Sequence, residues 1–478
     1  MVSPVTAVRP KQAPPTAQPP PPTEVSPLTE TLTDPLTDIP PRTDVPPLTE
    51  ANAEGHLAAI CFKIGPPRLV GVEAEWFVHD AENPGSAVAP HRLEQALAAL
   101  PTDPDGEHPG SDGPLFPAGS RLTREPGGQV ELSSPPSDSP GDCAEGLLLD
   151  QGTLRAALAA QGLRLTGSGT DPLARERLMQ LSHPRYLAME RHFDRTGPWG
   201  RIMMCGTASL QVCVDAGTAR GPSSYAARWQ LLHRLGPVLV AAFANSPLLD
   251  GKPTGHRSTR QMVWSRMDPT RTLAPRLADG DPRGNWARYV LDAELLCVRR
   301  DHGRSWAAPT GCTFREWLRG DGERPPTLAD LDYHCTTLFP PVRPRGHLEL
   351  RMIDAQPGNG WLAPLALVTG LLDDPVAADT ALGALEVLDT SSLLPPRSEL
   401  WRRAATLAMA DPALRRAALT CFGAAEQALA RRPGSGRLRA ALTEFAERYP
   451  ARGRCPADDQ LDALRAGVHP VPLETAPC

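Results

Sequence analysis

The sequence predicts an α+β protein built around an antiparallel sheet. Four stretches alternate apolar and polar residues as half-buried strands do, at 71–80, 129–133, 207–215 and 346–354. The segments between them follow no regular strand–helix–strand rhythm, and the pattern from about residue 360 onward is almost entirely helical. Strands and helices mixed in this way favour an antiparallel sheet over a parallel one.

The first half of the chain is predicted to alternate helices and strands. Thr49 can cap a helix that runs to about Lys63 and stops at Gly65–Pro66–Pro67, and the strand "GVEAEWFVHD" follows it. Residues 80–120 read as loops around one short helix, "HRLEQALAAL". A helix near 142–161 then leads into a strand that begins "LRLT" and into a glycine-rich loop.

The second half is predicted to hold two more strands and most of the helices. We expect one strand over "RIMMCGTASLQVCVD" and then a long helix in which Pro237 introduces a kink. A loop rich in charge, Gly and Pro spans 248–285, and a helix follows near "NWARYVLDAELLCVR". The strand "GHLELRMID" comes next, followed by amphipathic helices such as "RSELWRRAATLAMA" and "GRLRAALTEFAERY".

The composition excludes several classes of protein. Hydrophobic residues make up 41% of the 478 residues, and no run approaches the ~20 apolar residues of a membrane span. The first residues lack the apolar core of a signal peptide. The net charge is −6 without a basic block, so neither nucleic acid nor a membrane is an expected partner. We expect a cytoplasmic protein, and the sequence does not indicate its oligomeric state.

The four strands carry polar side chains on one face each. Glu73 and Glu75 lie two residues apart on the first strand, so their carboxylates point the same way and repel each other unless a cation lies near. The other faces are listed here: Gln129, Glu131 and Ser133; Ser209, Gln211, Cys213 and Asp215; His347, Glu349 and Arg351. One such face alone could simply meet water. If all four lie in one sheet, they predict a floor of oxygen ligands suited to Mg²⁺, which bridges carboxylates to phosphates.

An arginine-rich segment accompanies these strands. The stretch "GKPTGHRSTRQMVWSRMDPTRT", 251–272, carries a group of cationic and aromatic residues: Lys252, His256, Arg257, Arg260, Trp264, Arg266 and Arg271. It reads either as a solvated loop or as a clamp for carboxylate or phosphate, which the planar arginine fork binds bidentately. Arg343 and Arg345 add cationic capacity beside the Glu349 strand. No P-loop motif is present.

The ten cysteines show neither a CxxC pair nor a disulfide framework, so we expect most of them to be reduced and buried. His334 and Cys335, with His347 nearby, are the one zinc alternative. It is weak, because adjacent ligands on a strand would point to opposite faces.

Taken in order, "GVEAEWFVHD", "REPGGQVELSSPP", "ASLQVCVD", the 251–272 segment and "HLELRMIDAQP" resemble the motifs of the glutamate–cysteine ligase family of plants and bacteria. Within that family they resemble most the actinobacterial members of ergothioneine biosynthesis. The resemblance covers roughly 48–400. It implies a fold similar to the catalytic domain of glutamine synthetase, with a curved, mainly antiparallel sheet flanked by helices. It also implies ligation of the L-glutamate γ-carboxyl to the L-cysteine amine, with ATP as co-substrate and Mg²⁺ as cofactor.

The resemblance also implies roles for individual residues. Glu73, Glu75, Glu131 and Glu349 would be metal ligands, and Glu73 and Arg351 would be catalytic, Arg351 facing the transferred phosphate. Arg260, Arg271 and Trp264 would bind glutamate, and Gln211 and Lys252 would contact the nucleotide. No residue is singled out as the base that takes the amine proton.

Three units are expected along the chain: a disordered Pro/Thr-rich arm over 1–45, a catalytic domain over 46–395, and a helical region over 396–478 packed on it. Three alternatives remain at this stage. The same scaffold could join glutamate or another carboxylate to a different amine, it could bind its ligands without catalysis, or the motifs could belong to an unrelated Mg²⁺-dependent phosphotransferase.

Overall fold

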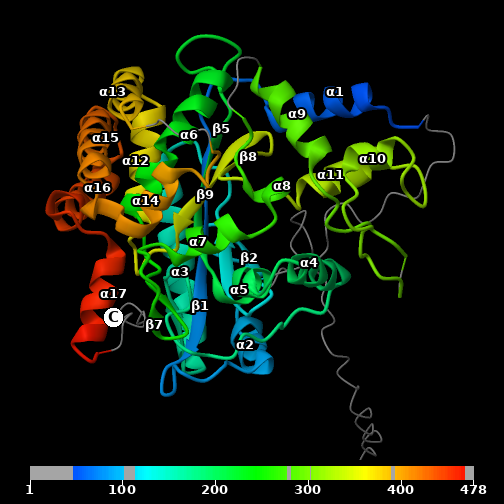
Figure 1. The fold of residues 1–478 in the computed structure, drawn as a ribbon. Helices are drawn as coiled ribbons and strands as arrows, with labels where there is room; N and C mark the ends of the chain where they lie inside the picture. The colour runs from blue at the N-terminus through cyan, green and yellow to red at the C-terminus, as the bar shows by residue number, and fades with distance from the viewer. Residues whose placement is uncertain (1–46, 102–113, 277–280, 302, 389–392, 469–478) are drawn as a thin grey trace, which may run out of the picture.

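The computed structural model describes residues 47–101, 114–276, 281–301, 303–388 and 393–468. At its centre lies a seven-stranded sheet whose neighbouring strands are all antiparallel (Figure 1). The strands in spatial order are β2 (Arg121–Arg124), β3 (Val130–Ser133), β1 (Val70–Asp80), β5 (Ser209–Asp215), β9 (His347–Asp354) and β8 (Val342–Pro344), with β4 (Leu163–Thr166) paired to β1. The predicted α+β fold with an antiparallel sheet is confirmed. The predicted N-terminal arm, 1–45, lies outside the described residues.

The register of this sheet aligns the polar faces of four strands. Glu73 of β1 lies opposite Gln211 of β5, and Glu75 lies opposite Glu131 of β3. Residues that face each other across antiparallel strands point to the same side of the sheet. β5 also pairs with β9, with a register shift between Leu210 and Val212. The strands that carry the predicted polar faces are therefore neighbours in one sheet.

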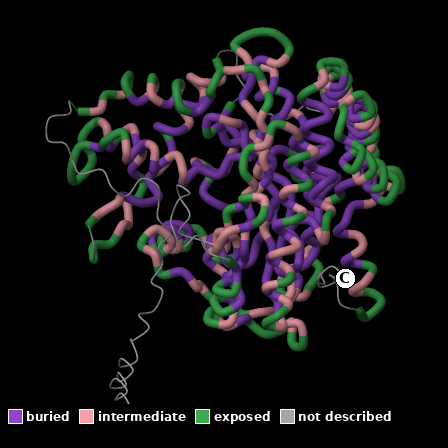
Figure 2. The backbone as a smooth tube through the Cα atoms, turned by 180° about the vertical axis from the view of Figure 1, so that it is seen from behind, coloured by how far each residue is buried: buried purple, intermediate pink, exposed green. Residues whose placement is uncertain are grey.

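The apolar face of the sheet is covered by helices. α3 (Pro140–Ala160) packs on β1, α6 (Tyr225–Ala242) on β9, and α12 (Leu362–Leu372) on β5. Every residue of α12 is buried, because it lies between the sheet and the outer helices α13 (Pro375–Glu386), α15 (Pro412–Ala430) and α16 (Gly436–Arg448). Figure 2 shows that buried residues fill the interior of the molecule and that exposed residues lie mostly at its periphery.

The C-terminal helices share this core with the sheet. The remaining elements of this region are α14 (Glu399–Leu407), the 3₁₀ turns η1 (Ala408–Ala410) and η2 (Pro450–Arg452), and α17 (Pro456–Arg465). One continuous apolar cluster includes Val72 of β1, Leu365 of α12 and Leu442 of α16. Pro237 lies within α6 without ending it. Among the described helices, none has the length and apolar character that a membrane crossing requires.

The polar face is bordered by shorter elements. Around the cleft lie α4 (Pro184–Asp194), α5 (Trp199–Gly206) and α7 (Thr259–Arg266). Further short elements are α8 (Pro269–Thr272), which contacts α7, α2 (Pro90–Ala98), which packs on α3, and the hairpin of β6 (Leu248–Leu249) and β7 (Lys252–Pro253). On the side away from the C-terminal helices lie α1 (Glu50–Cys61), α9 (Pro282–Asp292), α10 (Phe314–Leu318) and α11 (Leu328–Cys335) (Figure 1). Thr49 caps α1 as predicted, by accepting a hydrogen bond from Asn52 N.

Two predicted elements are wrong. The strand expected to begin at Arg201 begins only at Ser209, because the apolar residues before it form the buried face of α5. The loop expected over 248–285 is largely ordered into β6, β7, α7, α8 and the start of α9. Two caps explain the helices: Ser258 accepts from Gln261 N to start α7, and Asp268 precedes Pro269 at the first position of α8.

Candidate active site

The polar face of the sheet forms the floor of a cleft of about 580 Å³. Glu73 and Glu75 reach this cleft from β1, Glu131 from β3 and Gln211 from β5. They point the same way because residues two apart on a strand share a face and the register aligns the neighbouring strands. The structure thus brings together four of the residues predicted from the sequence.

Neutral neighbours orient two of these carboxylates. Glu75 accepts hydrogen bonds from the backbone N–H of Ser209 at 2.8 Å and from its hydroxyl at 2.6 Å. Glu131 accepts one from the Thr123 hydroxyl at 2.7 Å. An ionised carboxylate has about four acceptor positions, so each group keeps lone pairs for a further ligand.

The cleft concentrates negative charge. Burial, together with repulsion from Glu349, raises the pKa of Glu73 to about 7. Burial and repulsion from Glu75 likewise raise the pKa of Glu125 to about 7. The pKa of Glu131 is well above its ordinary value, because of burial and then of repulsion from Glu73 and Glu125. A bound cation would relieve this repulsion.

Arginines gather on the neighbouring strands. Arg343 of β8 and Arg351 of β9 both donate to the buried carboxylate of Glu349, Arg343 at 2.8 and 3.0 Å through its Nη2. Burial alone would raise the pKa of Glu349, but these guanidinium groups outweigh it and hold that pKa at about 2. Arg351 also donates to Gln211 Oε1. Arg343, Arg345 and Arg351 line the cleft, whereas the Glu349 carboxylate is turned toward the arginines.

Another wall of the cleft combines apolar side chains with arginine. Arg260 of α7 stacks on Trp264, with the guanidinium carbon 4.6 Å from the ring centroid. Its Nη2 donates to the Arg351 carbonyl at 2.8 Å. Its Nε is buried and has no hydrogen-bond partner within the part of the chain that the structure describes. Tyr186 and Met189 of α4 line the same cleft. Such a wall suits a substrate with a carboxylate and a short apolar body.

Two predicted site residues are not brought to the cleft. Arg271 is fully buried and donates to Asp268, to Thr337 and to the Glu294 carbonyl, so protein acceptors already occupy its guanidinium. Lys252 lies exposed in the β6–β7 hairpin. Neither belongs to the described residues that line the cleft. The structure does not bring either residue to the cleft, and direct ligand contact by them stays a prediction.

The structure adds residues that the prediction missed. Glu125 enters the cleft just before the Gly127–Gly128 turn of the β2–β3 hairpin. Gly128 has φ +86°, and a Cβ at Gly127 would lie 2.4 Å from Cys205 Cα, so only glycine fits this turn against α5. A glutamate directly before a Gly–Gly turn was the available signal. Arg185 and Tyr186, in the first turn of α4, carried no periodic signal in the sequence.

The donor set fits Mg²⁺, although no ready-made cage exists. Within the described residues, no group of three or more His, Cys, Asp or Glu side chains is gathered closely enough to hold a metal ion as it stands. The zinc alternative gains no support from that search, and His334 Nε2 hydrogen-bonds the Val290 carbonyl. Glu73, Glu75 and Glu131 nevertheless offer only oxygen ligands, and burial and repulsion from neighbouring carboxylates raise the pKa of Glu73 and of Glu131. Their chemistry therefore suits a hard divalent cation.

An antiparallel sheet with acidic side chains at the centre of its polar face and arginines beside them is the kind of site that an enzyme acting on phosphate groups uses. A family model described as glutamate–cysteine ligase family 2 matches residues 69–472. The chain belongs to the glutamate–cysteine ligase family.

Individual relatives agree with this assignment. The chain is 40% identical over 427 residues to the glutamate–cysteine ligase EgtA of Mycolicibacterium smegmatis, covering 86% of this chain and 94% of that protein. It is 39% identical over 423 residues to EgtA of Mycobacterium tuberculosis, covering 87% and 90%. The chloroplastic glutamate–cysteine ligase of Medicago truncatula is 32% identical over 270 residues, covering 55% and 52%.

A solved structure supports the fold. The glutamate–cysteine ligase of Francisella tularensis in complex with AMP superposes with a TM-score of 0.51, covering 86% of this chain and 87% of that one. At 13% identity this likeness concerns the fold alone. It agrees with the ligase fold expected from the sequence resemblance.

Proposed function

We propose that this enzyme joins the γ-carboxyl of L-glutamate to the amine of L-cysteine, with ATP, and releases γ-glutamylcysteine, ADP and phosphate. One observation carries the proposal: the sheet register brings Glu73, Glu75, Glu131 and Gln211 into a single cleft beside Arg351. The similarity along most of their length to two mycobacterial glutamate–cysteine ligases supports the choice of substrates. We further propose that the product serves ergothioneine biosynthesis, as the sequence resemblance implies.

The chemistry requires activation of a poor electrophile. A carboxylate oxygen is a poor leaving group, whereas the γ-glutamyl phosphate formed by transfer from ATP has a good one. Cysteine's neutral amine then attacks the acyl carbon, the carbon–nitrogen bond forms and phosphate leaves. In this proposal the cysteine substrate reacts through nitrogen, so no protein thiol takes part.

Different residues of the cleft are proposed to bind the metal ion, to stabilise the transferred phosphoryl group and to contact the nucleotide. Glu73, Glu75 and Glu131 would hold Mg²⁺, whose positive charge would offset the charge of the ATP phosphates. Glu349 can join these ligands only by giving up its contacts with Arg343 and Arg351. Arg351 would then be free to stabilise the moving phosphoryl group, where an arginine contributes on the order of 10³-fold or more. Gln211 holds Arg351 beside the floor and is proposed to contact the nucleotide.

We assign the amino-acid substrate to the wall that contains Arg260 and Trp264. The buried Arg260 Nε–H, without a partner among the described residues, can donate to a substrate carboxylate. Trp264 fixes the plane of that guanidinium by stacking. Arg185, held by Thr336 at 2.9 Å, offers a second cation on the α4 side of the cleft. We also propose a reducing, cytoplasmic setting, with which the nine free cysteines of the described residues agree.

The test is ADP release from the purified enzyme with Mg²⁺, ATP and glutamate, with and without cysteine, and with the product weighed by mass spectrometry. Cysteine-dependent release with a γ-glutamylcysteine mass is the expected result. Glycine, alanine and serine are offered in parallel as acceptors. Release driven better by one of these would keep the acyl-phosphate chemistry and reject cysteine as the acceptor. No ADP release with any amine would reject the proposed function.

A further inference from the structure

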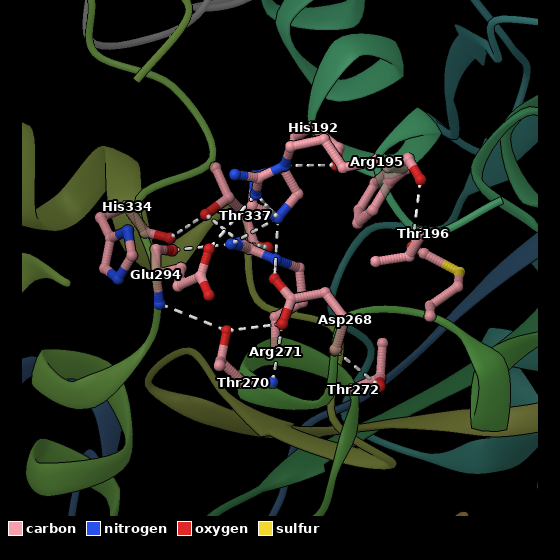
Figure 3. A network of polar contacts seen from close by, with 12 residues as sticks. His192, Arg195, Thr196, Asp268, Thr270, Arg271, Thr272, Glu294, His334 and Thr337 are labelled. Carbon is pink, nitrogen blue, oxygen red and sulfur yellow. Dashed lines mark hydrogen bonds and ion pairs between the residues drawn. The ribbon is translucent and has the colours of Figure 1, made fainter. Parts of the chain in front are cut away.

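A buried polar network lies behind the cleft wall, centred on Asp268 at the start of α8 (Figure 3). Its Oδ2 accepts hydrogen bonds from His192 Nε2 at 2.8 Å and from Arg271 Nε at 2.7 Å. Its Oδ1 accepts from the backbone and hydroxyl of Thr270, both at 2.8 Å. Asp268 is therefore saturated by neighbours from its own element and from α4.

The shortest contacts of His192 favour the neutral tautomer that donates through Nε2 to Asp268. Arg195 Nη2, a permanent donor, lies 2.8 Å from His192 Nδ1, so that nitrogen must accept. The same Arg195 Nη2 donates to Glu294 Oε2 at 3.2 Å. The last turn of α4 is thus tied both to Asp268 and to the segment that follows α9.

Arg271 carries the connection onward to the segment after α11. Its Nη1 donates to the Thr337 carbonyl at 3.0 Å, and its Nη2 donates to the Glu294 carbonyl at 2.6 Å. Its own carbonyl accepts from Phe339 N–H at 2.8 Å. One residue therefore fixes both Thr337 and Phe339.

Both tethered segments supply side chains to the cleft. α4 contributes Arg185, Tyr186 and Met189, and the segment 336–339 contributes Thr336 and Phe339. The two meet directly, since Arg185 donates to the Thr336 hydroxyl at 2.9 Å and to its carbonyl at 3.0 Å. Phe339 in turn lies under Arg351, with the guanidinium carbon 5.8 Å from the ring centroid. A shift in the network would therefore move Arg185 and Phe339 together.

We propose that Asp268, Arg271 and His192 are positioning residues that set the spacing of α4 and segment 336–339, and with it the part of the cleft that receives the amino-acid substrates. This inference rests on the proposed function for the identity of the ligands. In this proposal Arg271 does not contact the substrate but positions residues that line the cleft. The network lies behind the α4 wall, and its hydrogen bonds among the described residues do not extend to the carboxylate floor. The network reaches the phosphate side only through the packing of Phe339 under Arg351, so its loss should change amino-acid binding more than the use of ATP.

The test compares His192→Ala with His192→Gln. The alanine variant cuts the α4 tether but leaves the Asp268–Arg271 ion pair intact, so the buried charges stay paired. Glutamine can still donate to Asp268 and accept from Arg195. We expect His192→Ala to raise KM for glutamate or cysteine about tenfold, with KM for ATP and kcat within twofold of the parent. His192→Gln should recover most of the loss.

Asp411→Asn is the matched control. Asp411 is also a buried helix-capping aspartate paired with an arginine, but it lies at the start of α15, far along the chain from the cleft residues. Unchanged amino-acid KM values in His192→Ala, or equal losses in Asp411→Asn, would overturn the proposal. So would a loss in His192→Ala that glutamine fails to rescue.

Hydrogen exchange gives a readout independent of turnover. We expect amide exchange in residues 184–194 and 336–339 to rise together in His192→Ala and to stay at the parent level in Asp411→Asn. If the two segments do not change together, the coupling is rejected even in an active enzyme. Absence of ligase activity in the parent enzyme would instead reject the proposed function, and the exchange result would still decide whether the network couples the two segments.

Discussion

Glu73 and Glu75 lie on the same face of one strand, so both carboxylates can bind the same cation. They project from β1 into the cleft, where Glu131 approaches from β3. Burial and repulsion from neighbouring carboxylates raise the pKa of Glu73 and of Glu131, so a nearby cation would favour their ionised forms. Carboxylates held close together by a rigid sheet are suited to binding a divalent cation. Without a cation, their mutual repulsion raises the free energy of the ionised state.

Glu73→Gln should remove one unit of ligand charge with little change in shape. We expect kcat to fall on the order of 100-fold or more, because metal charge contributes several kcal/mol to transition-state stabilisation. We also expect the Mg²⁺ concentration for half-maximal rate to rise. Steady-state kinetics over a Mg²⁺ series measures both effects. Glu82→Gln, exposed just after the same strand, is the control, and parent-like kinetics in Glu73→Gln would contradict its assignment.

Arg260→Ala tests the proposed substrate carboxylate contact. A hydrogen bond to a charged group contributes about 1.5–3 kcal/mol, so KM for glutamate should rise about 10- to 150-fold. The KM for ATP should change much less. Arg260→Lys should recover only part of the loss, because lysine lacks the planar fork that stacks on Trp264. Arg266→Ala, exposed on the same helix, serves as the control, and an unchanged glutamate KM in Arg260→Ala would rule out the contact.

At the scale of elements, the cleft depends on segments far apart in the sequence. α4, α8 and the residues after α9 and α11 converge on Asp268 and Arg271 (Figure 3). Each of these elements is short, so its own hydrogen bonds give it little stability alone. The buried ion pair and its carbonyl contacts hold the elements in place, and their order therefore depends on the charge state of the network.

His192 should make this network sensitive to mild acid. Burial lowers the pKa of His192 below its ordinary value of about 6.5, although Asp268 opposes that shift. The folded state thus binds the proton more weakly than the unfolded state does. The stability from neutral His192 is present above pH 6.5 and is lost as the pH falls from 6.5 toward the folded pKa. The pKa of Asp268 is lowered from 3.8, so its own contribution is lost only in stronger acid.

We therefore expect the urea midpoint of the parent to fall more between about pH 7.5 and about pH 5.5 than that of His192→Gln, which cannot titrate. Urea unfolding at the two pH values measures the difference. Equal shifts in the two proteins would show that His192 does not contribute to acid sensitivity.

At the scale of the whole molecule, the C-terminal helices belong to the same core as the catalytic sheet. α12 lies between the sheet and the α13, α15 and α16 layer, and one apolar cluster runs through both. α17 is fixed to the sheet side by Gln460, whose amide donates to the Asn245 side chain at 2.6 Å and carbonyl at 3.0 Å. A boundary near residue 395 therefore separates segments of sequence that share one buried core.

Gln460→Ala tests this continuity. It leaves the buried Oδ1 of Asn245 without the amide that donates to it, although the Asn245 carbonyl keeps hydrogen bonds from Gly169 N and the Ser168 hydroxyl. An unsatisfied buried acceptor should lower the free energy of unfolding by about 1–3 kcal/mol. We expect one cooperative transition in both proteins and unchanged KM values, measured by urea unfolding and steady-state kinetics. Glu444→Gln, on the exposed side of α16, is the control and should unfold like the parent. A second, separate transition would show that the C-terminal helices unfold on their own.

Local sequence determined the parts of the protein that depend on local rules. The alternation of apolar and polar residues placed β1, β3, β5 and β9 and the carboxylates on them, because side-chain direction in a strand has a period of two. The Thr49 cap and the proline stop fixed α1 within two residues. The strand expected before Ser209 failed for the opposite reason, since burial against the rest of the fold turned those residues into α5. In the loop expected over 248–285, the caps Ser258 and Asp268 of α7 and α8 were local signals that the prediction did not use.

By itself, the sequence determined the α+β class, the acidic strands and the presence of arginines near them. Only the tertiary structure decided which arginines meet the cleft. Arg260 and Arg271 lie eleven residues apart in one cationic segment, yet α7 turns Arg260 toward the floor while α8 buries Arg271 against Asp268. Spacing along a chain fixes direction only within one helix or strand. The packing of separate elements decides what each side chain finally faces.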